Sequence, residues 1–165
     1  MIMKKIINSG LVWLWLAVCL IVIDQSTKYL AIQYLDFQQP THILKFLNLT
    51  LAYNKGAAFG FLHGATGWQN IFLGGLASIV GIVILIWLSR LSRNETRMCV
   101  ALCFIFAGAL GNLWDRLQHG YVIDFLSFHL GSWYFAIFNL ADSEIFIGAC
   151  MVILYWLLEV EKDEL

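Results

Sequence analysis

Two aspartates, Asp124 and Asp142, are the residues of this chain best suited to catalysis. Asp124 lies between apolar neighbours in the segment 122–125, and Asp142 follows it 18 residues later, near the start of an apolar run. Two carboxylates held together in a partly desolvated site share one proton. The ionised partner can take a proton from water while the protonated partner polarises a carbonyl, which hydrolyses an amide without a covalent intermediate. The sequence leaves open whether the two aspartates touch and which of them carries the shared proton.

Other catalytic chemistries have weaker support. No H-E-x-x-H or G-x-S-x-G motif is present, and Ser26 and Lys28 are two residues apart, so they do not face each other on a helix. The histidines are scattered in loops: His42, His63, His119 and His129. The cysteines lie in apolar runs, where a thiol behaves as a small hydrophobe: Cys19, Cys99, Cys103 and Cys150. We therefore expect neither a metal nor an organic cofactor.

Other polar residues also have plain structural interpretations. Asp24 and Lys28 are four residues apart and can pair on one face of a helix. Asp115 and Arg116 can reach lipid head groups at a membrane interface. Taken singly, these residues are as consistent with structure as with function.

The same is true around the two aspartates. Asn139 precedes Asp142 by three residues, as a helix N-cap precedes an acid in the first turn, and Asp124 can be a turn residue. Structural roles alone do not explain why Asp124 stands among apolar neighbours, close in sequence to a second carboxylate.

The composition is that of a membrane protein. Of the 165 residues, 61% are hydrophobic and 13% are charged, and a soluble domain of this length has too little interior to bury so much apolar surface. The formal net charge of −1 gives no support to a nucleic-acid partner. We predict one integral membrane domain over residues 1–165, all-α, with four transmembrane helices.

Four apolar runs are long enough to cross a bilayer as helices. They cover residues 11–30, 68–88, 98–114 and 139–158, and they leave two long loops, 31–67 and 115–138.

Basic residues predict the orientation of these spans. Lys4 and Lys5 precede the first run, and Arg90, Arg93 and Arg97 crowd the short turn between the second and third. An even number of spans separates the two places, so both lie on the cytoplasmic side. Both termini are then cytoplasmic, and both long loops are external.

With this topology, the polar candidates lie at the external ends of the spans or in the external loops. Ionisable groups in a membrane are costly and by default mark function. A transporter or channel subunit, which is the alternative function, would carry charged groups through the bilayer depth or on both faces. A passive scaffold would tolerate loss of both aspartates. The polar candidates gather at the external face of the membrane alone, and this favours a hydrolase over a transporter.

Two local patterns describe what surrounds the candidates. Apolar and polar residues alternate over 47–53, which predicts a short strand and a small sheet in the first external loop. Gly108 and Asn112 fall on one face of the third helix, where small residues allow a close crossing. An apolar groove with a polar end between helices is expected there.

The chain resembles the lipoprotein signal peptidase family, also called signal peptidase II. The resemblance covers nearly the whole chain and rests on five motifs in order: 24–28 (DQSTK), 54–59 (NKGAAF), 111–116 (GNLWDR), 120–125 (GYVIDF) and 138–142 (FNLAD).

The resemblance implies an aspartic membrane protease with Asp124 and Asp142 as its catalytic pair. Residues that shape the site or bind substrate would be Asn54, Gly108, Asn112, Asp115, Arg116, Asn139 and Ala141, with Asp24 and Lys28 as structural polar residues. Glu144 and Trp114 depart from the family pattern, and Glu144 would be a third acid near Asp142.

The resemblance also implies the substrate and the setting. The substrate would be a prolipoprotein cleaved before a cysteine that carries diacylglycerol, in the bacterial inner membrane near its outer face. Membrane lipids would be partners, and globomycin-type peptides would inhibit. A small sheet would follow the first helix, and an external helix would lie between the third and fourth.

Overall fold

The computed structural model describes residues 7–56, 68–131 and 133–163. Its elements in chain order are η1 (Gly10–Trp13), α2 (Leu14–Tyr34), β1 (Thr41–Leu44), β2 (Leu47–Asn54), α3 (Trp68–Arg90), α4 (Thr96–His119), β3 (Val122–Leu130), β4 (Trp133–Tyr134) and α5 (Leu140–Asp163).

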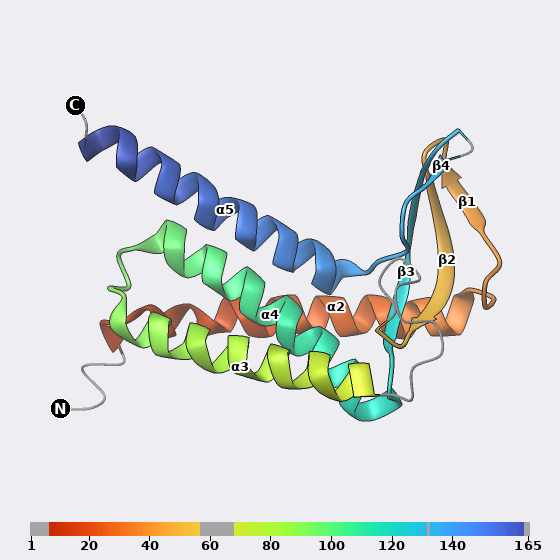
Figure 1. The fold of residues 1–165 in the computed structure, drawn as a ribbon, viewed down its shortest axis with the longest axis horizontal. Helices are drawn as coiled ribbons and strands as arrows, with labels where there is room; N and C mark the ends of the chain where they lie inside the picture. Colours follow the sequence, from red (N-terminus) through yellow and green to blue (C-terminus); the bar gives the residue numbers. More distant parts are fainter. Residues whose placement is uncertain (1–6, 57–67, 132, 164–165) are drawn as a thin grey trace.

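Four helical segments are long and apolar enough to cross a membrane: Gly10–Tyr34, Trp68–Arg90, Thr96–His119 and Leu140–Leu158. They form one bundle, with the sheet at one end and the short α3–α4 turn at the other, while α5 leans away from the sheet (Figure 1). The expected membrane bundle with a small sheet after the first helix is confirmed, and the protein is a multi-pass membrane protein.

Two helices extend into the segments predicted as external loops. α2 continues to Tyr34, and α4 continues through Asp115 and Arg116 to His119, so residues 115–119 are helix and not loop, contrary to the sequence prediction. α4 ends where Gly120 takes a left-handed conformation with φ of 76°, and the Gly120 N–H bonds to the Arg116 carbonyl. The predicted span ended too early because a hydropathy scale treats every charged residue as exposed to solvent, whereas Asp115 is buried.

α4 lies at the centre of the bundle. Of its most apolar stretch, 67% is buried by the rest of the chain, against 17–22% for the other three spans. Small residues on α4, among them Ala101, Ala107 and Gly108, let neighbouring helices approach closely. The other spans turn most of their apolar surface toward lipid.

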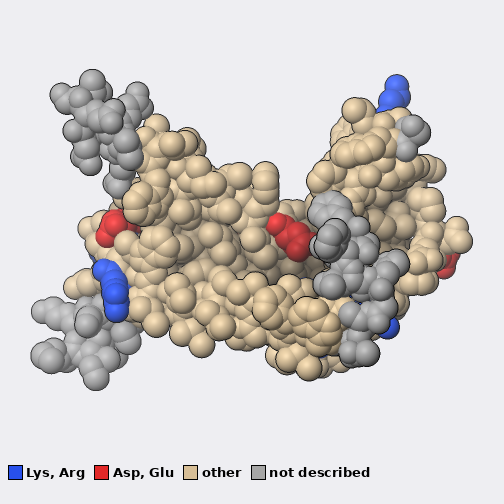
Figure 2. Space-filling view, viewed as in Figure 1, with Lys and Arg blue, Asp and Glu red and all other residues tan. Residues whose placement is uncertain are grey.

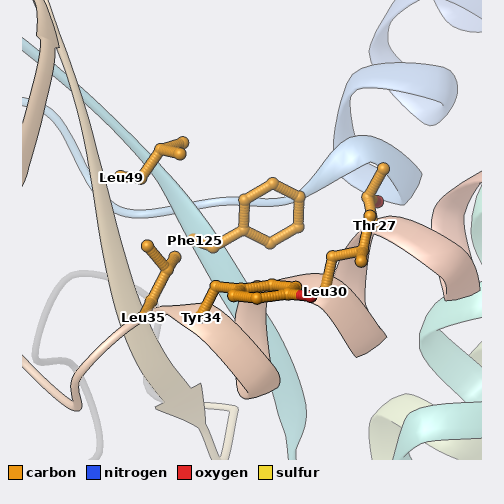
Figure 3. Close-up of a pocket in the computed structure, with 7 residues that line it drawn as sticks. Thr27, Leu30, Tyr34, Leu35, Leu49 and Phe125 are labelled. Carbon is orange, nitrogen blue, oxygen red and sulfur yellow. The ribbon is translucent and has the colours of Figure 1, made fainter.

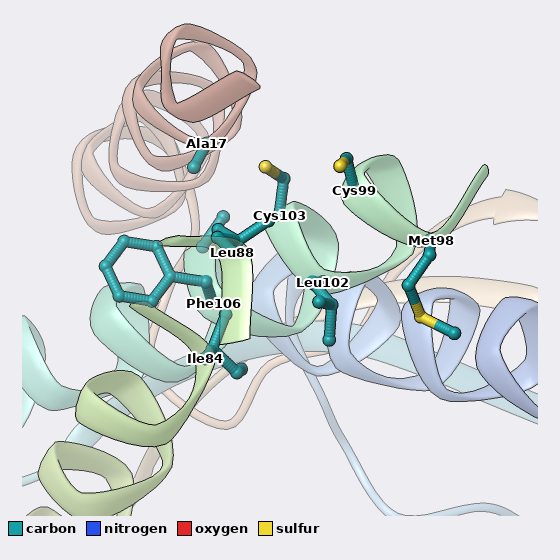
Figure 4. Close-up of a cluster of buried hydrophobic side chains, with 9 residues drawn as sticks. Ala17, Ile84, Leu88, Met98, Cys99, Leu102, Cys103 and Phe106 are labelled. Atoms are coloured by element: carbon teal, nitrogen blue, oxygen red, sulfur yellow. The ribbon is translucent and has the colours of Figure 1, made fainter. Parts of the chain in front are cut away.

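A cluster of buried apolar side chains closes the α3–α4 turn end of the bundle (Figure 4). It joins Ala17 of α2, Leu88 of α3 and Leu102 of α4, with Cys99 and Cys103 fully buried among them. The Sγ of Cys103 lies 3.4 Å from the Trp13 carbonyl oxygen. Both thiols thus serve as small buried hydrophobes with a weak hydrogen bond.

The sheet is antiparallel with strand order β1-β2-β3-β4. The predicted strand over 47–53 is β2, and its two neighbours are β1, which precedes it, and β3, which comes from the second long loop. A register shift between Leu49 and Ala52 places Ala52 opposite Asp124. The pairing of β2 with β3 therefore fixes the height of Asp124 above the bundle.

The external helix expected between the third and fourth spans is absent from the described part of residues 120–139. β3 and β4 occupy this region instead. The segment Val122–Leu130 is rich in β-branched and aromatic residues, and β2 offers it an edge with free backbone groups. Pairing with β2 satisfies those groups along most of the strand.

Gly148 of α5 provides a test of the tight crossing between α4 and α5. A Cβ at this position would lie 2.6 Å from the Ala101 carbonyl oxygen and 2.9 Å from the Ile105 nitrogen, so the backbones must separate. Gly148→Ala is expected to lower the free energy of unfolding by about 1–3 kcal/mol, measured by thermal melting in detergent.

Gly75→Ala of α3 is the matched control, because a Cβ there meets no atom within 4 Å. The control is expected to melt at or slightly above the wild-type temperature, since alanine favours helix. Equal melting of the two variants would show that α4 and α5 do not cross as closely as described.

Candidate active site

Asp124 is held in β3 by two amide side chains. Its Oδ2 accepts a hydrogen bond from Asn54 Nδ2 at 3.0 Å, and its Oδ1 accepts one from Asn139 Nδ2 at 2.7 Å. Only 2% of the residue is exposed. Asn54 belongs to β2 of the first long loop and Asp124 to β3 of the second, so both loops help to position this carboxyl group.

Asp142 is held in the first turn of α5 by a capping box. Asn139 is the N-cap: its Oδ1 accepts from the Asp142 N–H at 3.0 Å, while Asp142 Oδ2 accepts from the Asn139 N–H at 3.2 Å. The other oxygen, Oδ1, accepts from Asn112 Nδ2 of α4 at 2.8 Å. The capping interpretation of this pair is thus correct, and it also orients the Asp142 carboxylate.

Asn139 brings the two aspartates together. It is fully buried, its side-chain nitrogen bonds to Asp124, and its backbone and side-chain oxygen bond to Asp142. The contact that the sequence left open is made through this residue. Asp124 and Asp142 therefore lie in one polar site, close enough for each charge to act on the other.

The surroundings of Asp124 favour its protonated form. Burial is the largest cause and the negative charge of Asp142 is the next, and together they raise the pKa of Asp124 to about 7. The hydrogen bonds from Asn54 and Asn139 act in the opposite direction, as does the charge of Lys28. Near neutral pH, the Asp124 carboxyl group can therefore exchange a proton.

A second polar cluster, the Lys28 cluster, is buried among the helices next to the aspartate pair and consists of Lys28, Asp24, Asp115 and Asn112. Lys28 Nζ lies 2.9 Å from Asp24 Oδ2 and 2.9 Å from Asp115 Oδ2, and it donates to Asn112 Oδ1 at 3.1 Å. All three charged residues are at most 1% exposed. The pairing of Asp24 with Lys28 predicted from their spacing is present, but it is one side of a larger buried cluster.

This cluster positions the backbone beside each aspartate of the pair. Asp115 Oδ2 accepts from the Ile123 N–H at 3.1 Å, next to Asp124. Asp24 Oδ1 accepts from the Ala141 N–H at 3.0 Å, next to Asp142. Asp24 and Asp115 therefore act on the site through the main chain.

Gln25 belongs to the same cluster and was not singled out from the sequence. Its Nε2 lies 3.1 Å from Asp24 Oδ2, 3.0 Å from Asp115 Oδ1 and 3.2 Å from the Gly111 carbonyl oxygen. Its place in the 24–28 motif, directly after Asp24, was the available signal.

Gly108 and Ala141 set the distance between α4 and α5. A Cβ on Gly108 would overlap the Ala141 carbonyl oxygen, and Ala141 itself is fully buried. Any larger residue at Gly108 would separate Asn112 on α4 from Asp142 on α5.

Arg116 and Glu144 lie near the aspartate pair but interact with different residues. Arg116 Nη1 donates to the Asn112 carbonyl oxygen at 3.1 Å, and its Nε has no partner among the described residues. Glu144 is 5% exposed and interacts electrostatically with Asp24 and Lys28. Glu144, the acid that departs from the family pattern, thus acts on the Lys28 cluster.

A cavity of about 290 Å³ opens between α3, α4 and α5 beside the pair. Leu73, Leu76 and Val80 are among its apolar walls, while Asp142 and Arg116 stand at its polar end. Acidic atoms are visible in the hollow between α5 and the sheet (Figure 2). The groove expected between the helices is therefore present, and it ends at the half-buried Asp142.

A second cavity of about 250 Å³ is separate from the pair. Leu30, Tyr34 and Phe125 are among the side chains that line it, between the end of α2 and the sheet (Figure 3). Successive side chains of a strand point to opposite faces, so Phe125 faces this cavity and Asp124 faces away from it.

Comparison with known proteins gives a consistent result. The family model described as signal peptidase (SPase) II matches residues 16–158. A lipoprotein signal peptidase from Coxiella burnetii is 51% identical over 146 residues, which cover 88% of this chain and 90% of the relative. One from Alteromonas mediterranea is 44% identical over 152 residues, covering 92% and 84%. A solved bacterial membrane enzyme aligns with a TM-score of 0.78 at 33% identity, covering 88% and 87%.

Proposed function

This chain belongs to the signal peptidase II family and removes signal peptides from prolipoproteins, and we propose that it does so as an aspartic endopeptidase with Asp124 and Asp142 as its catalytic pair. The observation that carries the proposal is the double role of Asn139, which bonds to both carboxylates at once.

In the proposed reaction, Asp124 starts protonated and Asp142 starts ionised. Asp142 takes a proton from water as the water oxygen attacks the scissile carbonyl carbon, and Asp124 donates a hydrogen bond to the carbonyl oxygen. Collapse of the tetrahedral intermediate breaks the C–N bond, and the leaving amine takes up the proton that Asp142 had accepted from water, which returns Asp142 to its ionised form. Asn54, Asn112 and Asn139 keep the two carboxyl groups oriented through these steps.

The substrate is proposed to be a prolipoprotein whose cysteine carries diacylglycerol, cleaved just before that cysteine. The cavity between α3, α4 and α5 supports this assignment, because its apolar walls suit acyl chains and its polar end is Asp142. Arg116 lies beside Asp142 in this cavity, its Nε has no partner among the described residues, and its guanidinium is proposed to donate to a substrate carbonyl.

The site is proposed to face the outside of the bacterial inner membrane. Arg90, Arg93 and Arg97 near the α3–α4 turn support a cytoplasmic position for that end, with both termini on the same side. The sheet and the aspartate pair then lie at the outer surface, where a translocated prolipoprotein arrives. Membrane lipids are the expected neighbours and globomycin-type peptides the expected inhibitors.

The test is the rate of cleavage of a diacylglyceryl prolipoprotein by the purified protein as a function of pH. Mass spectrometry should place the cut directly before the lipidated cysteine. Because the pKa of Asp124 is raised to about 7, its proton is present below that pH and lost above it. We expect kcat/KM to fall about tenfold per pH unit on the alkaline side of pH 7.

Asn54→Ala provides the matched comparison. The Asn54 hydrogen bond lowers the pKa of Asp124, so its removal is expected to shift the alkaline limb of the profile to higher pH. A wild-type rate that keeps rising through pH 9 would exclude a protonated Asp124 from the reaction.

A further inference from the structure

A third cavity, of about 500 Å³, lies on the sheet away from the aspartate pair. It is lined by His42, Ile43, Leu44, Lys45 and His129, which come from β1, the turn after it and β3. His129 lies five residues beyond Asp124 on the same strand, about 17 Å along it. We propose that this cavity binds the phosphate group of a membrane phospholipid.

A row of polar side chains crosses the sheet toward the cavity. His42 pairs with Asn48, and Asn48 pairs with Ser127, so the three share one face, and His129 is two residues further along the same face. The Nδ1 of His42 lies 2.7 Å from Asn48 Oδ1. Because an amide oxygen only accepts, the His42 nitrogen donates this bond.

Donors without a partner lie along this row. Asn48 is fully buried, and its Nδ2 has no hydrogen-bond partner among the described residues. Neither ring nitrogen of His129 has a partner there. Buried polar groups are nearly always hydrogen-bonded, and both the amide and the imidazole carry at least one N–H. His129 lines the cavity, so a turn of its ring brings an N–H to an acceptor that enters, whereas Asn48 lies outside the lining and holds His42 in place.

The charge at the cavity selects an anion. Lys45 is exposed and forms no ion pair with any residue that the structure describes, and no carboxylate lines the cavity. On the face shown in Figure 2, the tip of the sheet carries basic atoms and no acidic ones. A phosphate group has several strong acceptor oxygens and a negative charge, which suits the two imidazoles and the ammonium that line the cavity.

The rim of the cavity identifies a lipid as the source of the phosphate. Large apolar and aromatic side chains at the tip of the sheet are exposed, including Phe46 at 49%, Leu130 at 78% and Trp133 at 64%. The sheet stands at the end of four membrane spans, and aromatic residues at such positions lie at the depth of the lipid head groups. Phosphate is the anion present at that depth.

The experiment follows the ring signals of His42 and His129 by NMR, in the full chain in neutral detergent. Three probes are titrated: a short-chain phosphatidylglycerol, the matching short-chain diacylglycerol without phosphate, and inorganic phosphate. We expect the phosphatidylglycerol to shift the His129 signal saturably and the diacylglycerol to leave it unchanged. Lys45→Gln should weaken phosphatidylglycerol binding about tenfold through loss of a charge-assisted contact.

Lys55→Gln is the matched control, because Lys55 is also exposed but does not line this cavity, and its binding should equal that of the wild type. Tighter binding of the lipid than of inorganic phosphate supports a head group as the source. Equal binding of the two would overturn the lipid assignment in favour of a free anion. The same shift with diacylglycerol, or equal weakening in both lysine variants, would overturn the phosphate site itself.

Discussion

Replacement of Asp124 or Asp142 by asparagine is expected to lower kcat/KM for prolipoprotein cleavage by about 10²–10⁴-fold. Asparagine keeps the size of the side chain but can neither take a proton from water nor exchange one near neutral pH. Both substitutions act on groups that share Asn139, so the double variant should be little worse than either single variant. The measurement is single-turnover cleavage of a diacylglyceryl prolipoprotein in detergent.

Folding must be followed in the same variants. Both oxygens of Asp124 accept from amide nitrogens, so the new NH₂ group of Asp124→Asn faces a donor, which costs about 1–3 kcal/mol. Asp36→Asn, at an exposed aspartate between α2 and β1, is the matched control and should retain full activity. Either folded variant of the pair with more than about a tenth of the wild-type rate would remove that aspartate from the mechanism.

Lys28→Met is expected to lower the free energy of unfolding by about 3–5 kcal/mol, or to prevent folding. The ammonium group lies 2.9 Å from each of two buried carboxylates, and its loss leaves Asp24 and Asp115 without their counter-ion. For a chain of this length the change corresponds to a melting temperature lower by about 6–20 °C.

Apolar replacement of the whole buried cluster is not expected to restore stability. Asp115 also accepts from the Ile123 N–H and Asp24 from the Ala141 N–H, so removal of the carboxylates would leave two buried backbone donors unpaired. Lys45→Met, at an exposed lysine, is the control and should melt within about 1 °C of the wild type. A Lys28→Met protein as stable and active as that control would mean that the cluster does not support the site.

The membrane spans and the strand β2 were predictable because their causes are local. A bilayer requires about 20 consecutive apolar residues from each helix, and four runs in the sequence meet this requirement. The strand over 47–53 was visible because side chains in a strand alternate between two faces. Each pattern is complete within one segment and needs no knowledge of its neighbours.

The last turn of α4 and the strand β3 were not predicted, because neighbours decide both. Asp115 belongs to a helix only because Lys28 and Gln25 of α2 pair with it inside the bundle. Val122–Leu130 forms a strand because β2 offers an edge to pair with. Hydropathy and propensity count each residue alone, so they placed both segments in a loop.

The sequence by itself determined that this is a membrane protein of four spans and which residue types could act, with the family resemblance singling out Asp124 and Asp142. Only the tertiary structure decided that Asn139 joins the two aspartates, and that Lys28, Asp24 and Asp115 form a buried support beneath them. The physical reason is that the deciding contacts join distant positions in the chain: Asn139 bonds to Asp124 across 15 positions and Asp24 to the Ala141 N–H across 117. They exist only where α2, α4, α5 and β3 meet, and no local pattern records that meeting.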